Sequence, residues 1–210
     1  MLIGYSDITA LHVAIFQKTG LISFHGPVAA SEFTEYTVDH FQKVVMQPQA
    51  NFMIKPAKEN LESEETNFHP KTIVAGKAMG KLMGGNLSLL ASLVGTDFTP
   101  NFKNKIVFIE DIGEKPYRID RMLTQLRQGT NLREAKGIAL GIFADCEAKE
   151  GDNSLTLMET LTDRLGDLNI PVVYGLSFGH IANQMTLPIG GEVEINTADF
   201  SIKLSAMAVT

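Results

Sequence analysis

The chain has 210 residues, of which 44% are hydrophobic and 8% aromatic, a composition typical of a globular protein with one large or two small domains. Its formal net charge of -6 argues against a nucleic-acid partner or an anionic membrane surface, since both require a basic face. A single cysteine excludes an intramolecular disulfide, and no run of 18 apolar residues is present. With no signal-peptide pattern at the amino terminus, we expect a cytoplasmic protein.

Residues 1–47 show two strand and helix patterns in alternation. The segment MLIGY predicts a strand, and ITALHVAIFQK, closed by Thr19-Gly20, predicts a helix because its apolar residues recur at helical spacing. The segments LISFHGP and SEFTEYTVDHFQKVVM repeat the strand and the helix. Two strands and two helices bury too little surface for a core of their own, so we expect another part of the chain to pack on them.

The composition changes between residues 48 and 71, where three prolines and an acidic cluster occur. This pattern is typical of a linker or a peripheral hairpin with a solvated acidic face. The sequence therefore predicts a first unit over residues 1–47, a linker over residues 48–71 and a second unit over residues 72–210.

The second unit begins with a glycine-punctuated strand and a helix in TIVAGKAMGKLMGGNLSLLASLVGT. Further strands and helices alternate in KNKIVFIED, YRIDRMLTQLRQ, AKGIALGIFADCE, SLTLMETLTDRLGDL and IPVVYGLSFGH. The chain closes with the segments GEVEIN and DFSIKLSAMA. This alternation favours an α/β fold with a mainly parallel sheet, finished by an antiparallel hairpin around residues 196–199.

Polar residues end several of the apolar strands, and ligands of open α/β sheets bind beyond such strand ends. The residues at these ends are Ser6, Glu110-Asp111, Asp145 and His180. A hydroxyl, a carboxylate and an imidazole are the parts of an acyl-transfer triad, in which the histidine takes the serine proton and the carboxylate orients the histidine.

Each of these residues also has a structural interpretation. Ser6 and Asp7 are both preferred helix N-caps, and Glu110-Asp111 could simply cap the next segment. His180 could be a hydrogen-bonded loop residue. These alternatives stay open on the residues alone.

The other histidines and the cysteine are weaker candidates. His25 closes another strand and is the rival for the general base, whereas His12 lies in a helical pattern and is expected to be structural. His40 falls on a presumed helix surface and His69 in the linker. Cys146 is expected to be a small core residue at a strand end.

Metal and phosphate chemistry have little support in the sequence. The histidines are scattered without ligand spacing, and no HExxH motif is present. Gly84-Gly85-Asn86 could cradle an anion before a helix, but a tight turn explains the glycines equally well.

Three segments, GYSD, FIEDIGEKPYRIDRML and GLSFGHIANQMTLPIG, resemble the signature segments of the serine peptidase family of L,D-carboxypeptidases. This family includes murein tetrapeptide carboxypeptidases and microcin-immunity peptidases. The segment GGNLSLLASLVGT also resembles the second domain of the family. The resemblance implies the remnant of a Rossmann-like first domain, lacking its upstream part, followed by a mixed-sheet α/β second domain.

The resemblance also implies roles for particular residues. Ser6 matches the nucleophile, Glu110 the carboxylate and His180 the general base, and the backbone N-H of Asp7 would be one oxyanion donor. The implied reaction is hydrolysis of the amide before the terminal D-alanine of murein tetrapeptide during cell-wall recycling. No metal or other cofactor is implied, and a homodimer is the expected assembly.

Three other functions remain open at this point. The chain could be a non-catalytic fragment or binding module of the family, because family members carry further residues upstream of the nucleophile. It could be a microcin-immunity-type peptidase, although it has no Trp on which to stack a nucleotide-like group. An esterase or amidase of unrelated fold is the third alternative.

Overall fold

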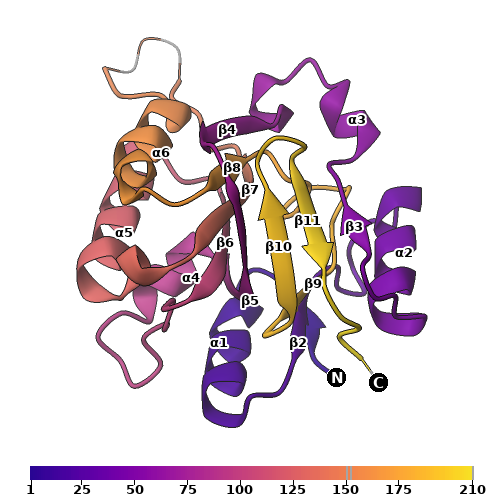
Figure 1. Ribbon diagram of the computed structural model, residues 1–210. Helices are drawn as coiled ribbons and strands as arrows, with labels where there is room; N and C mark the ends of the chain where they lie inside the picture. Colours follow the sequence, from indigo (N-terminus) through magenta and orange to yellow (C-terminus); the bar gives the residue numbers. More distant parts are fainter. Residues whose placement is uncertain (150, 152, 210) are drawn as a thin grey trace.

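The computed structural model describes residues 1–149, 151 and 153–209. Its strands form two sheets (Figure 1). The smaller sheet has the order β1-β2-β9, in which β1 (Ile3–Gly4) and β2 (Ser23–His25) are parallel and β9 (Leu187–Ile189) is antiparallel to β2. This small sheet therefore pairs strands from the first 25 residues with a strand from the last part of the sequence.

The larger sheet has eight strands in the order β3-β11-β10-β5-β6-β7-β8-β4. These strands are β3 (Met53–Ile54), β4 (Lys71–Val74), β5 (Lys77–Asn86), β6 (Lys105–Ile112), β7 (Gly137–Ala144), β8 (Val172–Tyr174), β10 (Glu192–Asn196) and β11 (Ser201–Leu204). The four strands from β5 to β8 are parallel, and the outer strands pair antiparallel. The sheet is thus mixed, and its centre is the parallel sheet that the alternating pattern predicts.

Six α-helices connect and cover these strands: α1 (Ile8–Thr19), α2 (Glu35–Phe41), α3 (Lys58–Leu61), α4 (Leu87–Ser92), α5 (Pro116–Gly129) and α6 (Leu157–Leu165). A π-helix over Gln42–Met46 continues α2, and short 3-10 helices span Thr66–Phe68, Leu132–Glu134 and Gly166–Leu168. Helices α4, α5 and α6 pack in a row along one side of the larger sheet (Figure 1). No helix in the described part of the chain is long and apolar enough to cross a bilayer.

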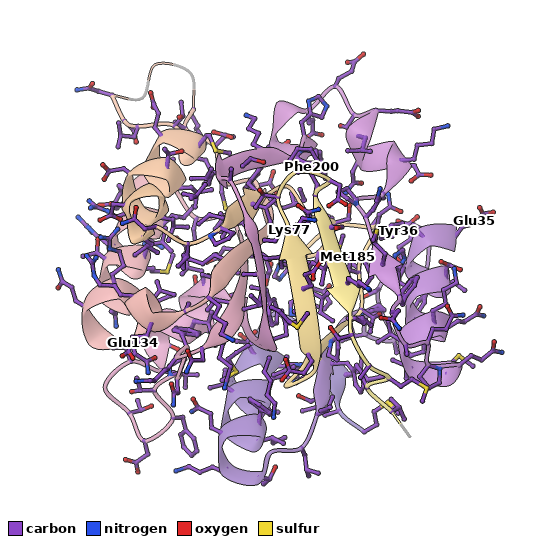
Figure 2. All side chains as sticks on the ribbon, in the orientation of Figure 1. Glu35, Tyr36, Lys77, Glu134, Met185 and Phe200 are labelled. Atoms are coloured by element: carbon purple, nitrogen blue, oxygen red, sulfur yellow. The ribbon has the colours of Figure 1, made fainter. Side chains whose placement is uncertain are left out.

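Residues from both sheets form one continuous hydrophobic core. Val13 of α1 and Phe24 of β2 belong to the same buried cluster as Leu82 of β5 and Leu187 of β9. Side chains fill the space between the strands and the helices (Figure 2). The expectation that other parts of the chain pack on residues 1–47 is confirmed, since α1 contacts both β5 and α4.

The segment over residues 48–71 contains regular structure. It supplies β3, which pairs with β11 at one edge of the larger sheet, and the short helix α3. The division of the chain at residues 47 and 71 stays a prediction.

Candidate active site

Ser6 lies in the turn between β1 and α1. Its φ of +58° is a conformation that costs a non-glycine residue about 1–3 kcal/mol. The carbonyl of Ser6 accepts a 2.9 Å hydrogen bond from the backbone N-H of Thr9, which closes the first turn of α1. Asp7 is the N-cap, but within the described structure its side chain makes no capping hydrogen bond. The strained turn is therefore not explained by a side-chain cap from Asp7.

Glu110, near the end of β6, and His180, within the loop between β8 and β9, form a direct pair. The Nδ1-H of His180 donates a 2.8 Å hydrogen bond to Oε2 of Glu110. The Glu110 side chain is 0% exposed and that of His180 is 15% exposed. Because a carboxylate only accepts, this contact fixes the proton on Nδ1 and leaves Nε2 of the neutral ring as an acceptor.

Burial and the ion pair act against each other at this site. Burial raises the pKa of Glu110, although the hydrogen bond and charge of His180 oppose that rise. For His180, burial lowers the pKa, but the hydrogen bond and charge of Glu110, together with the charge of Asp111, outweigh it and leave the pKa above its usual 6.5. The carboxylate thus favours a protonated imidazole, which is the state a general base reaches during catalysis.

Tyr5 connects the Ser6 turn to His180. The rings of Tyr5 and His180 meet edge to face, with centroids 4.9 Å apart. A cavity of about 300 Å³ is lined by both residues and by Glu32 and Gln184. Since Tyr5 directly precedes Ser6, the structure brings the Ser6 turn and the Glu110–His180 pair into one region.

Asp111 has a different environment from that of its neighbour Glu110. It is 2% exposed and accepts hydrogen bonds from Asn86 Nδ2 and from both the N-H and the hydroxyl of Ser88. The backbone N-H of Asn86 in turn donates to the hydroxyl of Thr9 on α1. Asp111 therefore has a structural role, but it ties β6 to the start of the preceding helix α4 and does not cap the next helix, α5, as expected.

The glycines before Asn86 do not form a tight turn. Gly84 and Gly85 lie inside β5, and their side-chain positions are occupied by neighbouring segments. A Cβ on Gly84 would lie 1.8 Å from the carbonyl oxygen of Phe108, and one on Gly85 would lie 2.4 Å from the hydroxyl oxygen of Thr9. The turn interpretation was wrong, because the glycines allow β6 and α1 to approach the strand closely.

His12 and His25 are both buried, with different surroundings. His12 donates from Nε2 to the carbonyl of Gly4, and its Nδ1 lies 2.8 Å from the hydroxyl of Ser23, as expected for a structural residue. Burial lowers the pKa of His25 to about 3, and within the described residues neither of its ring nitrogens has a hydrogen-bond partner. The geometry therefore favours His180, not His25, as the partner of the carboxylate.

The remaining histidines and the cysteine have other surroundings. His40 is 6% exposed and packs against the rings of Tyr36 and Phe52, so its expected place on a helix surface was wrong. His69 contacts the carbonyl of Ser63 through Nε2. Cys146 is a buried core residue after β7, as expected, and burial raises the pKa of its thiol to about 12.

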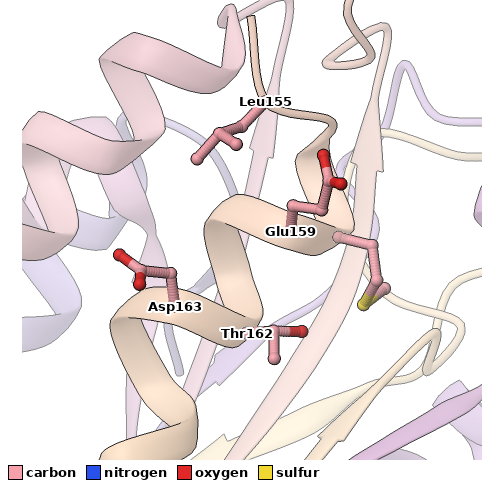
Figure 3. A pocket seen from close by; sticks show the side chains of 5 residues that line it. Leu155, Glu159, Thr162 and Asp163 are labelled. Carbon is pink, nitrogen blue, oxygen red and sulfur yellow. The ribbon is translucent and has the colours of Figure 1, made fainter.

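Asp145, another polar residue at a strand end, lies on the other side of the His180 loop. Its φ is +53°, and it lines a cavity of about 340 Å³ together with His180, Asn183 and Phe68. The loop that carries His180 thus lines two cavities. A further surface pocket of about 450 Å³ on α6, lined by Leu155, Met158, Glu159, Thr162 and Asp163, includes none of the candidate residues (Figure 3).

Among the residues that the structure describes, no group of three or more His, Cys, Asp or Glu side chains could hold a metal ion. A partly exposed imidazole and a buried carboxylate pair directly, and Tyr5 links this pair to the strained turn that carries Ser6. The fold and this pair mark the region as the candidate active site of an α/β protein.

Comparison with known proteins specifies the class. Residues 79–195 match the model of the LD-carboxypeptidase C-terminal domain, and residues 1–26 match the LD-carboxypeptidase N-terminal domain. The chain belongs to the LD-carboxypeptidase family.

Curated relatives extend this finding over nearly the whole chain. A probable murein peptide carboxypeptidase of Bacillus subtilis (strain 168) is 40% identical over 205 residues, which cover 97% of this chain and 62% of the relative. A putative carboxypeptidase of Synechocystis sp. is 40% identical over 200 residues, covering 92% of this chain and 60% of the relative. The chain spans about three fifths of the length of these relatives.

Solved structures show the same fold. The muramoyltetrapeptide carboxypeptidase of Oxalobacter formigenes matches with a TM-score of 0.78 and 33% identity, over 96% of this chain and 66% of that one. The microcin C7 self-immunity protein MccF matches with a TM-score of 0.80 and 27% identity, over 100% of this chain and 68% of that one.

Proposed function

We propose that this chain carries the catalytic groups of a serine carboxypeptidase, with Ser6 as nucleophile, His180 as general base and Glu110 as the carboxylate that orients His180. The observation that carries the proposal is the 2.8 Å bond between His180 and the fully buried Glu110, beside the turn that holds Ser6. A buried carboxylate paired with a partly exposed imidazole is the arrangement that activates a hydroxyl nucleophile.

In the proposed mechanism each group takes one step. Oγ of Ser6 attacks the carbonyl carbon while Nε2 of His180 takes its proton, because Nδ1 is engaged by Glu110. The backbone N-H of Asp7 is one donor to the oxyanion, and such a donor contributes about 3 kcal/mol to transition-state stabilisation. His180 then protonates the leaving amine, and a water molecule, deprotonated by His180, hydrolyses the acyl-enzyme.

The proposed substrate is a murein tetrapeptide, cleaved at the amide before its terminal D-alanine during cell-wall recycling. The names of the Bacillus subtilis relative and of the Oxalobacter formigenes structure support this substrate class. We also propose a cytoplasmic homodimer, for which sedimentation of the purified chain is the direct measurement.

A second candidate function is cleavage of a microcin-type aminoacyl nucleotide. It is favoured by the match to MccF, which reaches a TM-score of 0.81 over 100% of this chain. One of the solved MccF structures contains aspartyl sulfamoyl adenosine.

A panel of three compounds separates the candidates: a murein tetrapeptide ending in D-alanine, its L-alanine counterpart and aspartyl sulfamoyl adenosine. Mass spectrometry of the products should show release of D-alanine and little release from the other two. Preferential release of aspartate would instead support the immunity-type activity. No product from any of the three would support the alternative of a non-catalytic fragment or binding module.

A further inference from the structure

The segment over residues 179–184 carries His180, and its residues line both cavities beside it. It lies outside the helices and strands. Among the described residues, the backbone of this segment makes no hydrogen bond to another backbone group. Backbone hydrogen bonds hold its flanks, from Ile142 N-H to the carbonyl of Phe178 and from Met185 N-H to the carbonyl of Ser177, whereas side chains make the contacts within it.

One side chain binds the backbone of this segment twice. The hydroxyl of Thr37 on α2 donates a 2.9 Å hydrogen bond to the carbonyl of Ala182 and accepts a 2.9 Å hydrogen bond from the N-H of Gln184. Figure 2 labels Tyr36 and Met185, the chain neighbours of Thr37 and Gln184. These contacts join segments that are about 145 residues apart in the sequence.

The environment of Thr37 leaves its hydroxyl a single arrangement. Thr37 is 0% exposed, and its hydroxyl accepts a second hydrogen bond, at 3.1 Å, from the hydroxyl of Thr34. A hydroxyl has one proton to donate and two lone pairs, so the three contacts use its full capacity. The backbone N-H of Thr37 donates to the Thr34 side chain, which caps α2 and holds Thr37 in place.

Other contacts of the segment leave its backbone less constrained. The Gln184 carboxamide donates to the carbonyl of Ile181, a contact within the segment itself. Asn183 donates to the side chain of Asn60, which joins two side chains and no backbone. In the described part of the chain, Thr37 is thus the outside residue that fixes the backbone directly.

We propose that Thr37 is a positioning residue. Its hydroxyl holds the backbone of residues 182–184 in place, so that His180 keeps its hydrogen bond to Glu110 and the loop keeps its position in the walls of both cavities. The proposal concerns a residue that does not touch the reacting atoms, and its consequence for turnover rests on the proposed function. A misplacement of about 1 Å in a catalytic group can lower the rate about 100-fold.

The test compares Thr37→Val, which removes the hydroxyl at nearly constant volume, with Thr37→Ser, which keeps it. Thr160→Val is the matched control, because Thr160 is 1% exposed and its hydroxyl bonds to its own helix, α6, at Thr156. Circular dichroism reports folding, and Thr37→Ala replaces Thr37→Val if the latter is unfolded.

Two readouts are taken on each variant. Imidazole NMR titration, with the His180→Gln chain used to assign the signal, follows the pKa of His180. Release of D-alanine gives kcat and KM. We expect Thr37→Val to lower the pKa of His180 and to lower kcat about tenfold or more, whereas Thr37→Ser and Thr160→Val stay near the unchanged chain.

Equal His180 pKa values in the Thr37→Val and Thr37→Ser chains would overturn the proposal. A Thr37→Val chain with both the His180 pKa and kcat unchanged would also overturn it. If the unchanged chain releases no D-alanine, the proposed function fails, but the NMR titration still decides whether Thr37 positions His180.

Discussion

At the scale of single residues, two neighbouring carboxylates have different roles. Glu110 faces His180 with one oxygen, whereas Asp111 is engaged by Asn86 and Ser88. The pairing of β6 with β7 is irregular between Ile109 and Asp111, and the two neighbouring carboxylates have different main partners. A change at Glu110 should therefore affect the chemistry, and a change at Asp111 should affect the packing of α4.

The first prediction concerns pH. Since His180 must be neutral to act as a base and Glu110 raises its pKa, kcat/KM should fall at low pH with a midpoint above the usual 6.5. In Glu110→Gln the attraction is lost while burial remains, so the midpoint should move to lower pH and kcat should fall by about 100-fold or more. The pH–rate profiles of both chains measure this, and a midpoint that does not move would contradict the assigned pairing.

The same pair has a consequence for stability. A histidine whose pKa is raised on folding stabilises the folded state fully below its unfolded pKa of 6.5, and this contribution is lost as pH rises through the folded value. The stability that Glu110→Gln loses relative to the unchanged chain should thus be larger at pH 6 than at pH 9. Urea unfolding at the two pH values gives the difference, and the opposite order would exclude a raised pKa.

The sequence pointed to Ser6, Glu110 and His180 because each follows an apolar run. The expected strand end at His180 was wrong, because β8 stops at Tyr174 and His180 lies in the loop beyond it. The sequence assigned the roles of these three residues through the resemblance of three segments. It could not predict the contacts of Tyr5 with His180 or of Thr37 with Ala182, because those contacts depend on how distant segments pack. Threonine in a helical pattern carries no signal that its hydroxyl will bind a loop 145 residues away.

At the scale of secondary-structure elements, close packing explains residues that a pattern cannot. Strands β6 and β7 are almost fully buried and were predicted from continuous apolar runs. Strand β9 has three residues, one of them Pro188, so periodicity did not reveal it. The glycines of β5 were predicted to form a turn. The neighbours that require glycine there come from β6 and α1, which the local sequence does not reveal.

A second prediction tests this packing. A Cβ on Gly84 would meet the backbone of Phe108 in the next strand, so Gly84→Ala should destabilise the fold by more than about 3 kcal/mol. Gly166→Ala is the control, because its Cβ would meet its nearest neighbour at an ordinary 3.8 Å. Thermal unfolding of the two variants measures the contrast, and equal melting temperatures would refute the close approach.

At the scale of the whole molecule, the smaller and larger sheets share one core. The sequence predicted two units and a linker, and it also predicted that residues 1–47 need a partner to bury their apolar face. Val13 and Phe24 of that part of the chain lie in the same buried cluster as Leu82 and Leu187. A shared core couples the two sheets energetically.

The third prediction follows from this coupling. Unfolding should be a single cooperative transition, with calorimetric and van't Hoff enthalpies in agreement. Far-ultraviolet circular dichroism and tyrosine fluorescence should give the same midpoint. Two resolved transitions would instead mean that residues 1–47 and residues 72–210 unfold as separate units.

We propose above that Ser6 is a nucleophile activated by the Glu110–His180 pair. The most direct measurement is D-alanine release from murein tetrapeptide by mass spectrometry, with this chain and its Ser6→Ala variant side by side. The account predicts release by the unchanged chain and a loss of at least about 1,000-fold in the variant, which keeps its fold by circular dichroism. Equal release by the two chains would contradict the claim.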